Sequence, residues 1–160
     1  MPSYKKKKDE QKGCNIMPKN EKKYIFEGWF SILMPDTWIY SIDEDLLTVY
    51  AAENGKGAIQ ISFLHLLERD DSLRVTAENH LNRFLNQYSV KTEENTYKVI
   101  EAPGFTIANA SGEFDNEFIK VWTLVNEKKM LLVTYISPKK TRELSTVEDI
   151  IYSINFDAVD

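Results

Sequence analysis

The chain has few of the residues that build catalytic or metal centres. Its 160 residues include a single cysteine, Cys14, and two histidines, His65 and His80. One cysteine excludes an internal disulfide framework and a cysteine-rich zinc site. A lone thiol is typical of a reducing compartment, so we expect a cytoplasmic protein held together by its hydrophobic core.

The usual signatures of enzymes are missing as well. Neither histidine has a metal-ligand spacing, and both are interpreted as structural residues. Cys14 lies in a polar tail without a base or a pocket. The sequence contains no Gly-x-Ser-x-Gly turn and no Gly-rich loop at a helix start. These absences predict a protein that is not an enzyme and that carries no cofactor and no metal.

Two acidic bends leave weak ion binding open. Glu113, Asp115 and Glu117 lie in one bend, and Asp43 and Asp45 lie in the other. Calcium needs six to eight oxygen ligands, and neither bend matches a calcium-binding loop. Solvated loops are therefore the favoured interpretation.

No apolar run approaches the ~20 residues of a membrane span, so we expect no transmembrane segment. Charge is distributed unevenly, because residues 1–23 hold eight lysines against three acidic residues, whereas the remainder holds 12 basic and 22 acidic residues. This predicts a basic N-terminal extension, 1–23, and a single α+β domain, 24–160. The extension has no arginine and one aromatic residue, Tyr4, which argues against nucleic-acid binding. A solvated tail is favoured, and contact with anionic lipid is the alternative.

Apolar residues at every second position predict a strand over 24–34. Pro35 lacks the N–H that a central ladder requires, so the strand should end there. Trp38 is then expected to fold its ring back over the sheet.

Turn residues and periodicity predict the remaining elements. Asn54-Gly55 indicates a hairpin. Strands are predicted over 46–52, 58–66, 96–101, 105–114, 118–125 and 130–136, the last so apolar that it should be central. A helix over 76–88, capped by Thr76, carries the stripe Ala77, Leu81, Phe84, Leu85 and Tyr88. A second helix begins near Thr141.

The predicted fold class is α+β. Hairpin-length connections make the sheet antiparallel, with about six or seven strands. Strands with apolar side chains on both faces need cover on both faces, which predicts a three-layer α/β/α sandwich with helices on either side.

This order of elements resembles the PsbP-like superfamily. The resemblance rests on Phe-x-Ile-x-x-Pro-x-x-Trp, formed by Phe30, Ile32, Pro35 and Trp38, and on the closing helix with Ile150, Ser153, Ile154 and Phe156. The superfamily includes photosystem extrinsic proteins, a Ran-binding nuclear import factor, small bacterial proteins of unknown function, and relatives that look like effector chaperones. The resemblance implies a largely non-catalytic docking fold for residues 24–156 and supplies no catalytic motif.

Two functional hypotheses follow. The first is a non-catalytic protein-binding, adaptor or chaperone-like module of bacterial type, which uses a sheet face, an edge strand or a homodimer. Trp29 and Trp38 are the candidate partner surface, with Trp29 preferred because it shares a mixed face with polar residues. The alternative is a small-molecule or ion-binding protein that uses a cleft between the sheet and a helix.

Overall fold

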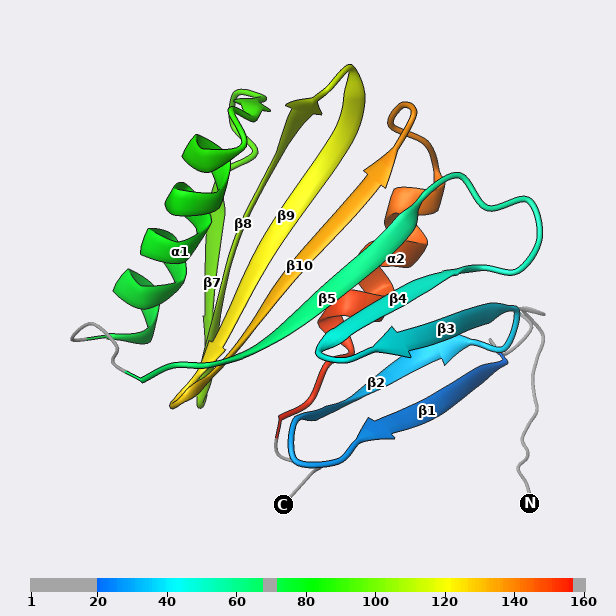
Figure 1. Ribbon diagram of the computed structural model, residues 1–160, viewed down its shortest axis with the longest axis horizontal. Coiled ribbons are helices and arrows are strands. Elements are labelled where there is room, and N and C mark those ends of the chain that lie inside the picture. The colour runs from blue at the N-terminus through cyan, green and yellow to red at the C-terminus, as the bar shows by residue number, and fades with distance from the viewer. Residues whose placement is uncertain (1–19, 68–71, 157–160) are drawn as a thin grey trace, which may run out of the picture.

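The structure is a computed structural model, and it describes residues 20–67 and 72–156 (Figure 1). Ten strands and two helices are formed in these residues. In chain order they are β1 (Glu21–Phe26), β2 (Phe30–Pro35), β3 (Trp38–Asp43), β4 (Leu46–Ala51), β5 (Ala58–His65), α1 (Leu73–Gln87), β6 (Lys91–Thr92), β7 (Lys98–Ala102), β8 (Phe105–Phe114), β9 (Glu117–Asn126), β10 (Lys129–Ser137) and α2 (Glu143–Tyr152).

Eight strands form one antiparallel sheet, and β1 and β2 form a separate hairpin. The order in the main sheet is β3-β4-β5-β10-β9-β8-β6, and β7 also pairs with β8. The apolar strand β10 lies between β5 and β9, where Val133 is opposite both Ile61 and Trp122. The predictions of an antiparallel sheet and of a central strand over 130–136 are therefore confirmed.

The two faces of the sheet are packed differently, which gives three layers. Helix α2 and the β1–β2 hairpin cover one face, where Leu131, Val133 and Tyr135 of β10 are fully buried. Helix α1 packs on the other face against β7, β8 and β9. Figure 1 shows α1 at one side of the sheet and α2 behind β10 and β5. The predicted three-layer α+β arrangement is confirmed.

The cover over the α1 face is incomplete. Among the described residues, α1 is the helix on that face, and its contacts are with β7, β8 and β9. No helix formed by the described residues lies on the corresponding side of β10, β5, β4 and β3 (Figure 1). Apolar side chains on this strip remain in contact with water, and Leu64 is 38% and Ile39 43% exposed. The expectation of full helical cover on both faces is therefore wrong for these strands.

The single strand predicted over 24–34 is also wrong. The chain turns at Gly28, whose φ is +83°, and Trp29 N–H donates to the Phe26 carbonyl at 2.9 Å. Phe26 then pairs with Phe30, and Tyr24 pairs with Ile32. Directly opposed residues of an antiparallel pair point to the same face. The turn therefore keeps the apolar period of two that a continuous strand would show.

Three further details differ from the predictions. The first strand begins at Glu21 rather than at residue 24, and residues 38–43, for which no strand is predicted, form the edge strand β3. Helix α1 begins at Leu73 because Ser72 is its N-cap, accepting a bond from Val75 N–H at 3.1 Å. Thr76 lies in the first turn and donates its hydroxyl to the Ser72 carbonyl. Part of the predicted charged connection before this helix, residues 68–71, lies outside the described residues.

Candidate functional site

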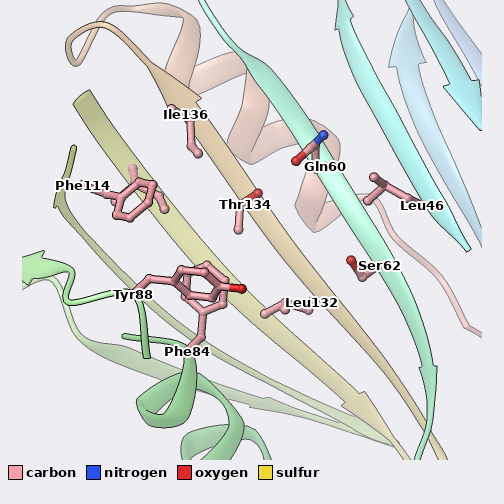
Figure 2. Close-up of a pocket in the computed structure, with 10 residues that line it drawn as sticks. Leu46, Gln60, Ser62, Phe84, Tyr88, Phe114, Leu132, Thr134 and Ile136 are labelled. Carbon is pink, nitrogen blue, oxygen red and sulfur yellow. The ribbon is translucent and has the colours of Figure 1, made fainter. Parts of the chain in front are cut away.

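A groove runs along the flank of α1 where this helix meets the open side of the sheet. We call it the α1 groove. It consists of two adjoining hollows of about 270 and 330 Å³, which share Phe84, Tyr88 and Leu132. Figure 2 shows the first hollow, with Phe84 of α1 and Tyr88, the C-cap residue of that helix, on one side and Leu132 of β10 across from them.

The floor of the groove is built from every second residue of β10. Leu132, Thr134 and Ile136 face the groove, while the alternating residues are buried against α2. Pairing places Ser62 of β5 opposite Leu132, and Gln60 opposite Thr134. The floor therefore mixes apolar side chains with neutral hydroxyl and amide groups, as Figure 2 shows.

The wall comes from the last turns of α1. Phe84 and Tyr88 are four residues apart, and their ring centroids lie 4.6 Å from each other. Tyr88 also meets the ring of Phe114 edge-on at 6.1 Å. Leu81 and Leu85 turn inward and are buried on the sheet. The helix stripe read from the sequence is thus divided between an inner row that anchors α1 and an outer row that lines the groove.

The rim of the second hollow carries positive charge. Arg83 lies there with His80 and Gln87, all on α1. Arg83 has no ion pair among the described residues. The described lining of both hollows contains no aspartate and no glutamate. A ligand that fits this site would combine an apolar body with a negative group near Arg83.

The tryptophans proposed as a partner surface lie elsewhere. Trp38 is 6% exposed and belongs to the core beneath the hairpin, so it offers a partner little surface. Trp29 is half-buried at the β1–β2 turn, where its ring lies 4.5 Å from that of His65 and 6.0 Å from Lys129 Nζ. The structure does not bring Trp29 into the α1 groove.

The other sequence candidates show no ligand-like clustering. Within residues 20–67 and 72–156, no three or more His, Cys, Asp or Glu side chains come together as a metal site. Asp115 and Asn116 adopt φ values of +55° and +66° in the tight turn between β8 and β9. The His65 ring contacts that of Trp29 at a tilt of 41°, and both His65 and His80 line the second hollow. Cys14 lies outside the described residues.

One half-buried carboxylate has a clear structural task. Glu143, at the start of α2, accepts bonds from Lys56 N–H at 3.1 Å, Gly57 N–H at 3.0 Å and the Tyr135 hydroxyl at 2.7 Å. Burial, and then the bond to Glu143, raises the pKa of Tyr135 from 10.0 to about 12. Glu143 therefore fastens the β4–β5 hairpin to α2 and β10. We call this arrangement the Glu143 clasp.

Comparison with known proteins identifies the fold. No family model and no curated protein matches the sequence. The solution structure of cyanobacterial PsbP from Synechocystis is similar, with a TM-score of 0.63, 12% identity, and coverage of 89% of this chain and 95% of that chain. A crystal structure from Bacteroides thetaiotaomicron is also similar, with a TM-score of 0.55, 15% identity, and coverage of 86% of this chain.

The chain spans 48% of the Bacteroides protein. At these identities the likeness concerns the fold alone, and it confirms the PsbP-like fold that the sequence resemblance implies. Within the described part of the chain, neither helix is long and apolar enough to cross a bilayer.

Proposed function

We propose that this protein is a non-catalytic binding module that holds a protein partner on the open sheet face beside α1. The observation that carries the proposal is the strip of β10, β5, β4 and β3 that α1 leaves uncovered. An antiparallel sheet can leave a polar face to water, but this strip also carries apolar side chains, among them Leu64, Leu132 and Ile136. Among residues 20–67 and 72–156 no second layer lies over these strands, and a partner can supply one.

The strip offers a partner several partly exposed apolar side chains. Leu64 is 38%, Tyr88 43% and Tyr50 36% exposed, and Leu132 and Ile136 are half-buried. Burial of such a side chain from full exposure contributes about 1.5–3 kcal/mol, so covering the exposed two-fifths of each contributes roughly 0.6–1.2 kcal/mol. Association costs several kcal/mol, so a stable complex needs polar contacts in addition to this apolar burial.

A small apolar molecule is the second candidate, and the groove itself favours it. Each hollow, of about 270 or 330 Å³, lies near the lower end of the range for ligand pockets, ~300–1,000 Å³. A metabolite or lipid that binds only the folded protein raises its melting temperature. Stabilisation that is seen with the wild-type protein and lost in Leu132→Gln would favour this candidate.

Affinity capture from an extract of the source organism tests the proposed function. The full chain is compared with Leu132→Gln, which alters the groove floor, and with Ile100→Gln, a matched control. Ile100 is 43% exposed on β7, away from the groove. We expect one partner to be retained by the wild-type protein and by Ile100→Gln and lost by Leu132→Gln. Equal retention by all three proteins would contradict a role for this face.

Three expectations accompany this proposal. The basic extension, 1–23, and the domain, 24–160, remain a predicted division of the chain. The cytoplasmic location also remains a prediction. A homodimer through the same face is the competing form of association, and sedimentation of the wild-type protein and of Leu132→Gln distinguishes it from binding to another protein.

A further inference from the structure

We propose that the segment held in the α1 groove is an amphipathic helix of a partner protein, with an acidic side chain placed beside Arg83. The inference rests on the proposed function and specifies its partner. The helix would lie next to α1, over β10 and β5, as the second helix of that layer. Its apolar side would face Phe84, Tyr88 and Leu132.

The backbone of the floor decides between a helix and a strand. Strand β10 is paired with β5 and β9, and β5 is paired with β4 and β10. The floor strands therefore have both edges occupied and cannot accept an added strand. An extended peptide lying on the face would leave its own N–H and C=O groups without partners against an apolar surface. A helix satisfies those groups internally.

The dimensions of the groove match a short helix. Its floor runs along β10 from Met130 to Ile136, which at ~3.3 Å per residue is roughly 20 Å. A helix of that length has about 13 residues. Packed helices lie about 8–10 Å apart, a distance equal to about two strand spacings. A second helix at that distance from α1 therefore lies over the uncovered strands.

Charge determines which helix fits. Arg83 is exposed on the rim without an ion pair in the described residues, and the described lining has no acidic side chain. A carboxylate on the partner is therefore attracted to this rim. The chain's own residues 1–19, with six lysines against two acidic residues, would bring like charge to Arg83. A second copy of the groove has no aspartate and no glutamate in its described lining, so it offers Arg83 no opposite charge.

Selection from a displayed library of random 16-residue peptides tests the inference, with the full chain as bait and Leu132→Gln as counter-bait. We expect enriched peptides to carry apolar residues at three- and four-residue spacing and an acidic residue on one flank. A synthetic copy of an enriched peptide should bind at least tenfold more weakly to Leu132→Gln and unchanged to Ile100→Gln. Proline placed in the middle of the peptide should also reduce its affinity at least tenfold.

The charge is tested by exchange. The Arg83→Glu variant should bind the acidic peptide at least fivefold more weakly than the wild-type protein does. A peptide in which lysine replaces the acidic residue should bind Arg83→Glu with the affinity that the acidic peptide has for the wild-type protein. Groove-dependent peptides with apolar residues at every second position, or with many prolines, would overturn the proposal that the bound segment is a helix, while the proposed function would stand. Enrichment of no groove-dependent peptide overturns the inference, and capture from the extract then decides the proposed function separately. Equal binding of acidic and lysine peptides to the wild-type protein overturns the role of Arg83.

Discussion

Removing the carboxylate of Glu143 should destabilise the fold more than any other single change on the surface of α2. In Glu143→Ala the Tyr135 hydroxyl, on a side chain with 0% exposure, loses its acceptor. An unsatisfied buried hydroxyl costs about 1–3 kcal/mol. The N–H groups of Lys56 and Gly57 lose a charged acceptor, and α2 loses a negative charge at its positive end, worth about 0.3–1 kcal/mol.

Together these losses amount to about 3 kcal/mol, since the two backbone N–H groups can turn to water. For a chain of this size the melting temperature should fall by roughly 6–12 °C. Urea titration followed by tryptophan fluorescence measures the free energy of unfolding. Ser145→Ala, at an exposed position on the same helix, is the control and should be neutral.

A double-mutant cycle isolates the buried part of that cost. In a Tyr135→Phe background no hydroxyl is left without an acceptor, so Glu143→Ala should cost about 1–2 kcal/mol less than in the wild-type protein. The reasoning is refuted if Glu143→Ala lies within 0.5 kcal/mol of the wild type, which is below the loss of a single hydrogen bond. An equal cost in both backgrounds would also contradict the clasp.

Three further predictions concern the residues around this clasp and the start of α1. Folding raises the pKa of Tyr135 from 10.0 to about 12, so the contribution of the neutral hydroxyl to stability is complete below pH 10 and is lost as the pH rises towards 12. Between pH 9 and 12 the urea midpoint of Tyr135→Phe should therefore fall less steeply than that of the wild-type protein. A Cβ at Gly57 would lie 2.2 Å from the backbone carbonyl of Ile136, so Gly57→Ala should destabilise by about 2 kcal/mol in thermal unfolding, and an unchanged melting temperature would contradict this close approach. Ser72→Ala removes the N-cap of α1 and should cost about 1 kcal/mol, with faster amide exchange in the first turn of the helix as a second readout.

The central strand of the sheet could be predicted from the sequence, whereas the α1 groove could not. Strand β10 could be placed centrally because apolar residues at both parities indicate burial on both faces. Periodicity cannot say how far one helix extends across a sheet, so Leu132 and Ile136 were expected to be covered. It also cannot separate the inner from the outer row of α1, since Phe84 belongs to the same helical stripe as Leu81.

The hairpin in residues 21–35 shows a different limit. A tight turn that pairs Phe26 with Phe30 leaves the apolar alternation unbroken, so only Gly28 marks the turn in the sequence. The β3 strand was missed because Trp38 is core while Ile39 and Ile42 are exposed at an edge. Edge strands lack the regular contrast between buried and exposed positions on which strand prediction depends.

The composition of the groove floor explains how an uncovered face can persist in a stable protein. Gln60, Ser62 and Thr134 separate the apolar side chains of neighbouring strands, so the strip is not a continuous apolar patch of the kind that promotes aggregation. The same groups oppose indiscriminate binding, because a partner that covers them without offering hydrogen bonds leaves them unsatisfied at a cost of about 1–3 kcal/mol each. A partner helix must therefore place its apolar residues over Leu132 and Ile136 and its polar or small residues over the intervening positions. Recognition by this face depends on that register as well as on apolar area.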